Sequence, residues 1–182
     1  MTEEFEIPPD IYNTLNTVSE LSKKLKPCCL VKAEKSAAIK LGIELQSLTS
    51  DCSDHISKSV VKMFEKLFII NRSLLTCTQI RNSKQGAAIA NKDYSSQQPI
   101  FLFGILSQKL NIPTVSSTYS NQVLLGPLRG ANTSYTCNSK YLEVKNIQNL
   151  FICVATKRIY KDSQILINYE PGKTLHFWVR SY

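Results

Sequence analysis

The most informative part of this chain is the stretch Leu124-Leu-Gly-Pro-Leu-Arg-Gly-Ala-Asn-Thr-Ser-Tyr-Thr-Cys-Asn-Ser-Lys-Tyr-Leu-Glu-Val144. It is rich in Gly, Pro, Asn and Ser, the residue types that form turns. A second stretch, Leu150 to Tyr169, contains two runs of Val, Ile, Leu and Phe separated by a polar bend. Short apolar runs bounded by turn residues are typical of strands. The order of turn, strand, bend and strand therefore predicts a β-rich region.

The same texture extends upstream, because from Thr76 onward helical spacing fades and Gly and Pro punctuate short runs of Val, Ile, Phe and Tyr. Many short strands with few helices predict a barrel-like or folded-sheet domain. The expected strands are Cys77 to Arg81, Ala87 to Ala90, Pro99 to Leu106, Gln122 to Gly126, Lys140 to Lys145, Leu150 to Thr156 and Gln164 to Tyr169.

The two quoted stretches resemble the C-terminal signature of the SET family, the S-adenosylmethionine-dependent protein-lysine methyltransferases. That signature is an Arg-x-x-Asn-His-x-Cys-x-x-Asn segment, a strand, an Ala-x-x-x-Ile turn and a strand that ends in Tyr. The positions in register are Arg129, Asn132, Asn138, Ala155, Ile159 and Tyr169.

Upstream, Ser83 to Tyr94 and Ile100 to Leu106 look like the first half of the same family. Ala90 and Gly104 match it, and the family's two-glycine turn is reduced to Gly86 beside Ala87. The resemblance spans about Thr78 to Tyr169, and Ser107 to Asn121 takes the place of the family's variable insert.

The resemblance implies a role for several residues. The expected tight turn Gln85-Gly86-Ala87, with Asn132 and Thr133, would bind S-adenosylmethionine, and Tyr169 would orient the substrate amine as the catalytic residue. Phe177 and Trp178 would line or cover the substrate channel, although burial of a C-terminal tail is an alternative use for them. Arg129 is expected to be structural.

Some positions depart from the family pattern. Thr133 stands where the family has His, Tyr135 where it has Cys, and Ser163 with Gln164 where an acidic pair is common. Loss of the imidazole leaves backbone contacts to adenine possible, whereas the Cβ of Ala87 would intrude where backbone and cofactor meet. These departures bear on catalysis more than on fold.

Residues 1–75 have a different character and predict a helical module. Ile11, Leu15, Val18, Leu21 and Leu25 form a helical stripe that Pro27 ends. The pattern of Ala33 to Leu48 permits helix or strand, and its length favours a helix. A third helix is expected to begin at a cap formed by Asp51 or Ser53, to contain His55 and to end near Asn71. The expected fold is α+β, with a helical module at 1–75 and a β-rich SET-like domain of short strands at 76–182.

The 182 residues carry a net charge of +8, and the whole excess lies in the second part. Residues 1–75 have ten basic and ten acidic side chains, whereas residues 76–182 have twelve and four. A basic surface suits an acidic partner such as chromatin or nucleic acid, or serves solubility alone. Lys157, Arg158 and Lys161 form a basic bend within it.

The six cysteines show no zinc-hairpin spacing, so no metal site is expected, and the thiols are expected to be reduced. The N-terminus lacks the pattern of a secretory signal and no apolar run approaches the length of a membrane span, which predicts an intracellular protein. Phosphate-binding Gly-rich loops, GxGxxG and GxSxG are also missing from the sequence.

Three functions remain open. The first is a protein-lysine methyltransferase acting on a histone or another protein with a basic, lysine-containing tail, in chromatin and in the nucleus, as the resemblance implies. The second is a SET-derived interaction module that has lost catalysis and binds chromatin or a protein partner. The third, a basic nucleic-acid-binding module unrelated to SET, rests on charge alone.

Overall fold

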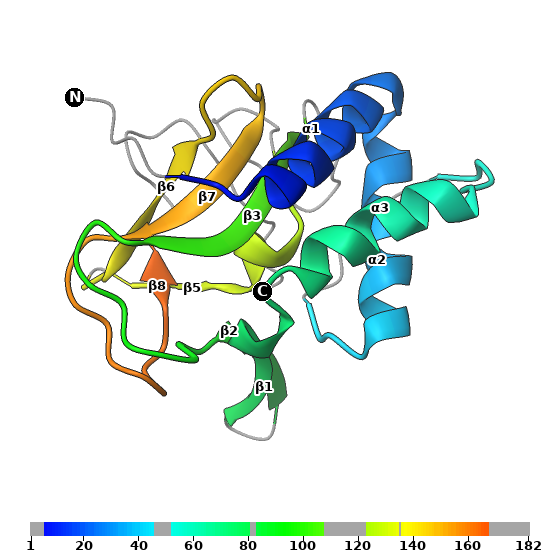
Figure 1. Ribbon diagram of the computed structural model, residues 1–182. Coiled ribbons are helices and arrows are strands. Elements are labelled where there is room, and N and C mark those ends of the chain that lie inside the picture. Colours follow the sequence, from blue (N-terminus) through cyan, green and yellow to red (C-terminus); the bar gives the residue numbers. More distant parts are fainter. Residues whose placement is uncertain (1–5, 46–51, 81–82, 108–122, 135, 168–182) are drawn as a thin grey trace, which may run out of the picture.

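The computed structural model describes residues 6–45, 52–80, 83–107, 123–134 and 136–167. Helices occupy the first part of the chain and short strands the second (Figure 1). The helices are α1 (Pro9–Lys24), α2 (Pro27–Leu41) and α3 (Lys58–Ile69), with single 3-10 turns η1 (Arg72–Leu74) and η2 (Pro127–Gly130). The strands are β1 (Leu75–Ile80), β2 (Ser83–Ala88), β3 (Pro99–Ser107), β4 (Val123–Leu125), β5 (Asn132–Thr133), β6 (Ser139–Glu143), β7 (Leu150–Ala155) and β8 (Leu166–Ile167). The predicted α+β class is confirmed.

The first two helices meet at Pro27. The prediction for α1 is confirmed, since it ends at Lys24. The second helix lies earlier in the chain than the predicted Ala33 to Leu48, because α2 begins at Pro27 and ends at Leu41. Proline suits the first turn of a helix, where its missing N–H has no partner to lose. The helix ends at Leu41, and the left-handed φ of 67° at Gly42 turns the chain so that the N–H of Ile43 donates to the carbonyl of Ala38 at 2.8 Å.

The third helix starts later than predicted. The helix α3 begins at Lys58 after an extended Ser57, so the predicted cap at Ser53 is wrong, and Asp51 lies outside the described residues. The fully buried apolar face of α3 begins at Val60. His55 therefore lies before the helix, on the surface, and not within it as expected.

The strands form three sheets, and every predicted strand overlaps an observed one. The largest sheet has the antiparallel order β4-β3-β7-β6, with an irregularity in β3 between Ile100 and Phe103. Strands β1 and β2 form a separate antiparallel hairpin, and β5 and β8 form a short parallel pair. In Figure 1 the hairpin projects away from the large sheet and the helices lie beside both.

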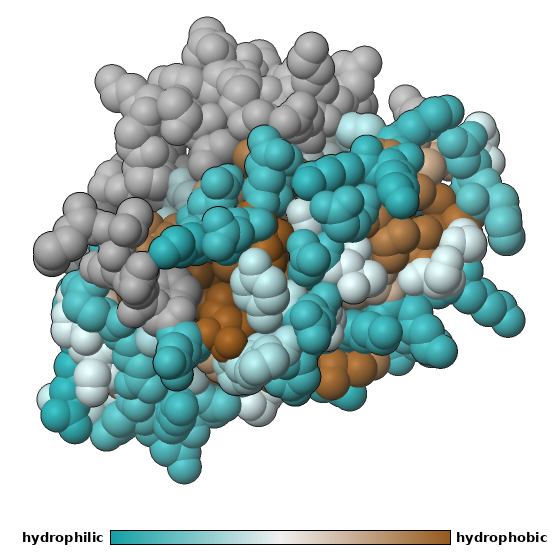
Figure 2. All heavy atoms as spheres, turned by 45° about the horizontal axis from the view of Figure 1, so that its top comes forward, coloured by the Kyte–Doolittle hydropathy of each residue, from teal (hydrophilic) through white to brown (hydrophobic). Residues whose placement is uncertain are grey.

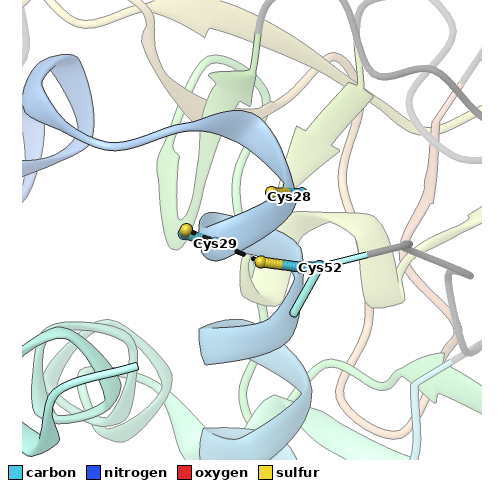
Figure 3. A group of neighbouring side chains, drawn as sticks. All are labelled: Cys28, Cys29 and Cys52. Atoms are coloured by element: carbon cyan, nitrogen blue, oxygen red, sulfur yellow. Dashed lines mark hydrogen bonds between the residues drawn. The ribbon is translucent and has the colours of Figure 1, made fainter. Parts of the chain in front are cut away.

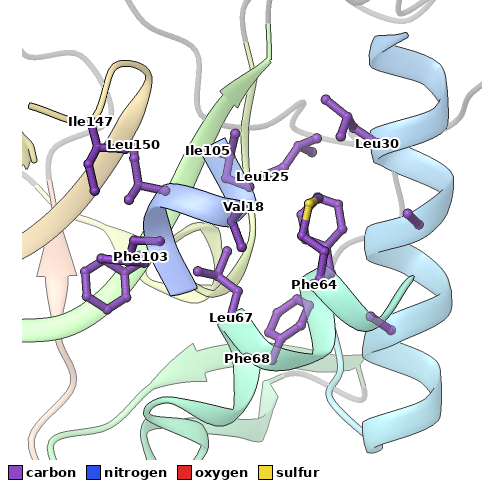
Figure 4. Close-up of a cluster of buried hydrophobic side chains, with 14 of the residues drawn as sticks. Val18, Leu30, Phe64, Leu67, Phe68, Phe103, Ile105, Leu125, Ile147 and Leu150 are labelled. Atoms are coloured by element: carbon purple, nitrogen blue, oxygen red, sulfur yellow. The ribbon is translucent and has the colours of Figure 1, made fainter. Parts of the chain in front are cut away.

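The large sheet is covered on both faces. Alternate residues of β3 and β7, among them Phe103, Ile105 and Ile152, pack against the helices through Val18, Leu30, Phe64, Leu67 and Phe68 (Figure 4). The other side chains of the same strands, such as Leu102 and Cys153, join a second cluster with Leu128 and Ile167. This period of two is the geometry of a strand. The helices and the large sheet thus share one core, and the boundary between residues 75 and 76 falls within β1 and stays a prediction.

The face shown in Figure 2 is mostly hydrophilic, with hydrophobic side chains gathered in separate areas. Among the described residues, the large apolar side chains with most exposure are Ile39, Ile69 and Tyr160. Within the described ranges, the helices are all too short or too polar to cross a membrane.

Candidate functional site

The parallel pair β5 and β8 brings the two quoted stretches together. Asn132 lies opposite Leu166 and Thr133 lies opposite Ile167. The backbone N–H of Ser134 extends the pairing by donating to the carbonyl of Ile167 at 3.2 Å. A parallel pair requires a long connection, here from β5 through β6 and β7. The polar turn and the final strand therefore form a single structural unit.

Asn132 joins this unit to the upstream half of the resemblance. Its Nδ2 donates to the carbonyl oxygen of Gly86 at 3.3 Å and to Oε1 of Gln164 at 2.7 Å. All three residues are half-buried. One amide thus connects β2, β5 and Gln164, two residues before β8, which are far apart in the sequence. Gln164, which the sequence presented only as a departure from an acidic pair, is a central residue here.

Asn138 holds the other side of the same unit. Its side-chain Nδ2 donates to the carbonyl of Gln164 at 2.9 Å, and its Oδ1 accepts from the N–H of Leu166 at 2.9 Å. The neighbouring Ser139 hydroxyl donates to the carbonyl of Leu166 at 2.9 Å. These bonds satisfy backbone groups of a two-residue strand that has few ladder partners. The matched asparagine is therefore structural in the described chain.

The segment Gln85-Gly86-Ala87 is not the tight turn that the sequence predicted. It lies inside β2, where Gln85 pairs with Thr78 and Gly86 pairs with Cys77 in a regular antiparallel ladder. The ladder continues over every residue of β2, so the backbone stays extended. The Cβ of Ala87 is buried, with 1% of the residue exposed. The segment still reaches the site, through the Gly86 carbonyl bound to Asn132.

Gly86 is packed against the chain's own backbone. A Cβ placed on it would lie 2.5 Å from the carbonyl oxygen of Glu44, in the segment that follows α2. Only glycine allows such a close approach of two backbones. The sequence assigned this position to contact with a cofactor, and nothing in the local pattern pointed to Glu44. One face of Gly86 is therefore occupied within the fold.

Arg129 is structural, as expected. Its Nε donates to both carboxylate oxygens of Glu34 at 2.9 Å, and its guanidinium NH2 also contacts Oε1. The backbone N–H of Gly126 donates to the same carboxylate. Both charged side chains are almost fully buried. The pair connects α2 to η2, directly before β5.

The basic bend has internal partners of its own. Asp93 accepts a hydrogen bond from the backbone N–H of Lys161 at 2.8 Å and one from Arg158 at 3.4 Å. These interactions, chiefly the Lys161 N–H, hold the pKa of the Asp93 carboxyl below its ordinary value. The Arg158 guanidinium also lies over the ring of Tyr160, 5.0 Å from its centroid. Part of the basic surface is therefore preorganised.

Five of the predicted site residues are described in part or not at all, and of these Gln85 is described by its backbone in β2. Tyr169, Phe177 and Trp178 lie outside the described residues. Thr133 is described by its backbone, which pairs with Ile167. The structure brings Gly86 and Asn132 together, with Gln85, Ala87 and Thr133 adjacent to them in β2 and β5.

No family model and no curated protein matches this chain. Among solved structures, it is similar to a Plasmodium falciparum protein proposed to be a histone methyltransferase, at 18% identity and a TM-score of 0.38 over 52% of this chain and 91% of that one. It is similar to the SET domain of the tumour suppressor RIZ1, at 12% identity and a TM-score of 0.38 over 70% and 89%. A third is ATXR5 in complex with histone H3.1 monomethylated on an arginine, at 14% identity and a TM-score of 0.41 over 84% and 93%.

The resemblance to SET proteins rests on the residues that the fold brings together. Gly86, Asn132 and Gln164 are each half-buried, so part of this polar group reaches the surface. The position that a Cβ of Gly86 would take is filled by the Glu44 carbonyl.

Proposed function

We propose that the protein is a SET-type protein-lysine methyltransferase that uses S-adenosylmethionine. The observation that carries the proposal is the contact of Asn132 with both Gly86 and Gln164. Two stretches that separately resemble the cofactor motifs of one family meet at one amide.

In this proposal the cofactor supplies an activated methyl group, and the chain's residues bind and align. The residues proposed to contact the cofactor are the backbone of Gln85, Gly86 and Ala87 in β2, and Asn132 and Thr133 in β5. An amide can exchange an internal hydrogen bond for one to a ligand at little net cost, because it offers both donor and acceptor. Asn132 is therefore suited to contact the cofactor.

Transfer requires a neutral lysine amine aligned with the methyl carbon, so orientation supplies most of the catalysis. We assign that role to Tyr169, which follows Ile167 by two residues in the sequence. A tyrosine hydroxyl can accept from or donate to the amine and so fix its direction. Phe177 and Trp178 are proposed to enclose the substrate side chain and exclude water.

The proposed substrate is a lysine in a basic protein tail, such as a histone tail, and the proposed location is the nucleus. Lys157 and Lys161, beside the Asp93-anchored Arg158, are proposed to contact an acidic chromatin surface. These residues are exposed and belong to the half of the chain that carries all of the excess positive charge.

A second function is favoured by a different observation. The Glu44 carbonyl covers one face of Gly86, and the Asn132 amide is already bonded within the fold. Both contacts suit a SET-derived module that has lost catalysis and binds a protein partner or chromatin. The two functions differ in affinity for the cofactor and in methyl transfer.

Calorimetric titration of the whole chain with S-adenosylmethionine separates them. We expect saturable binding that is lost in Asn132→Ala and kept in Asn13→Ala, an exposed asparagine of α1. Circular dichroism would confirm that both variants are folded. Absence of binding by the folded native chain would reject the methyltransferase and favour the interaction module.

Turnover is tested with labelled cofactor and histone tails as methyl acceptors. Tyr169→Phe should abolish transfer while cofactor binding persists. Tyr160→Phe is the matched control, since this tyrosine is 60% exposed on the connection between β7 and β8. Equal transfer by both variants would remove Tyr169 from the proposed mechanism.

A further inference from the structure

Three cysteines gather at the start of α2, away from the candidate functional site. Cys28 and Cys29 lie in the first turn of α2, and Cys52 belongs to the segment that precedes α3. Their three sulfur atoms all lie within 4.8 Å of one another. Figure 3 shows the three side chains together, with Cys29 and Cys52 in contact. Two separate segments thus supply one sulfur cluster.

The distances suit a tetrahedral metal. The Sγ atoms of Cys29 and Cys52 are 3.7 Å apart. In a tetrahedron with Zn–S bonds of about 2.3 Å, two sulfurs are separated by about 3.8 Å. A disulfide would require about 2.0 Å and would leave the third thiol unused.

A carboxylate lies beside the three thiols. Oδ2 of Asp54 is 3.7 Å from the sulfur of Cys29, whereas the group of ligand atoms within 4.8 Å of one another contains the three sulfurs alone, so Asp54 must shift to complete the ligand set. Cys29 is buried, whereas Cys28, Cys52 and Asp54 are partly or largely exposed, so a metal ion can enter from solvent. Three thiolates and a carboxylate form a ligand set that zinc accepts, because zinc takes both sulfur and oxygen ligands.

Nearby cations balance the charge of such a site. Lys26 Nζ lies 3.4 Å from the Asp54 carboxylate, and Lys32 Nζ donates to the Asp54 carbonyl at 3.0 Å. Three thiolates, one carboxylate and a divalent cation sum to −2, which two lysines offset. Without that compensation, a partly buried anionic site would carry a large desolvation cost.

We propose that Cys28, Cys29, Cys52 and Asp54 bind a structural Zn²⁺ ion. The cysteine spacing fits no zinc hairpin, so this site could not be predicted from the sequence, and only the fold brings Cys52 to Cys29. The ion ties the chain between α2 and α3 to the start of α2.

The test begins with the whole chain, purified in reductant, freed of metal with a chelator and titrated with Co²⁺. We expect one equivalent to bind, with thiolate charge-transfer absorption and the strong visible bands of tetrahedral cobalt. Zn²⁺ should then displace it. Ser in place of Cys28, Cys29 or Cys52 should each abolish stoichiometric binding, and Cys137→Ser should not. A folded native chain that shows no thiolate–cobalt absorption would overturn the site.

Alkylation of the native chain keeps the proposal testable if the variants fail to fold. Zn²⁺ should protect Cys28 and Cys52 from iodoacetamide and leave Cys137, which is half-buried, at its metal-free rate. Equal rates with and without Zn²⁺ would overturn the proposal, as would a Cys29–Cys52 disulfide in a chain that takes up no metal after reduction. Asp54→Asn should weaken Zn²⁺ binding, and unchanged affinity would remove Asp54 from the ligand set.

Discussion

Glu34 of α2 and Arg129 of η2 form an ion pair in which both side chains are almost fully buried. The two residues are separated by 95 positions in the sequence. The carboxylate also accepts from the N–H of Gly126, so a single acidic side chain ties a helix to the turn that leads into β5. The position of Asn132 therefore depends on a contact made from the N-terminal helices.

Loss of Arg129 should be severe. Arg129→Met leaves the buried Glu34 carboxylate without its partner, and we expect the free energy of unfolding to fall by about 3–5 kcal/mol. The double variant Glu34→Gln with Arg129→Met should recover much of it, because the amide oxygen still accepts from Gly126 and no charge is stranded. Urea unfolding measures both. If Arg129→Met lowers the free energy of unfolding by less than about 1 kcal/mol, the value typical of an exposed ion pair, the argument from burial is wrong.

Gly86→Ala should destabilise the chain through Glu44. The new Cβ would meet the Glu44 carbonyl oxygen at 2.5 Å, so backbone must move, and we expect a cost of about 1–3 kcal/mol. Amide hydrogen exchange should quicken in 43–45. Gly42→Ala is the comparison, since its cost comes from a φ of 67° with no atom within 4 Å of the added Cβ. Exchange rates in β2 should then stay native.

Asn132 should contribute to stability without any cofactor. Asn132→Asp places an acceptor opposite the carbonyl of Gly86 and Oε1 of Gln164, and we expect a loss of about 1–3 kcal/mol at neutral pH. Gln164→Glu in the native background retains an acceptor for the Asn132 amide and should cost less. Thermal unfolding of the two variants without cofactor makes the comparison. If the two variants lose equal free energy of unfolding, the 2.7 Å hydrogen bond from Asn132 to Gln164 is not the main source of the stability that Asn132 contributes.

Asp93 should titrate below its ordinary pKa of 3.8. The folded state lowers this pKa, so the stability that Asp93 contributes is present above the unfolded value and is lost as pH falls through the folded one. The largest cause is the Lys161 backbone N–H, so Arg158→Gln should raise the pKa only in part. Carboxyl NMR titration measures the midpoint, with Lys157→Gln as a control for loss of charge alone. A full return to the ordinary value in Arg158→Gln would reverse that order of causes.

Most of the helices and strands, and their order along the chain, could be predicted from the sequence. Helical spacing in α1 and α3 and the change to short apolar runs after Thr76 were enough, because periodicity follows from backbone geometry. The sequence did not predict β5, so Asn132, which was expected in a polar turn, lies in a strand. Prediction from the sequence failed where contacts with other parts of the fold set the local structure. Pro27 begins α2 as well as ending α1, and Gly86 lies in a strand and not in a turn.

The contacts between residues that are distant in the sequence could be found only in the folded structure. Glu34 with Arg129, Glu44 with Gly86, Gln164 with Asn132 and Cys52 with Cys29 are each pairs from separate elements. Local sequence patterns do not predict such partners. A side chain's partner depends on how the helices and the sheet pack around a shared core, and not on its neighbours in the sequence.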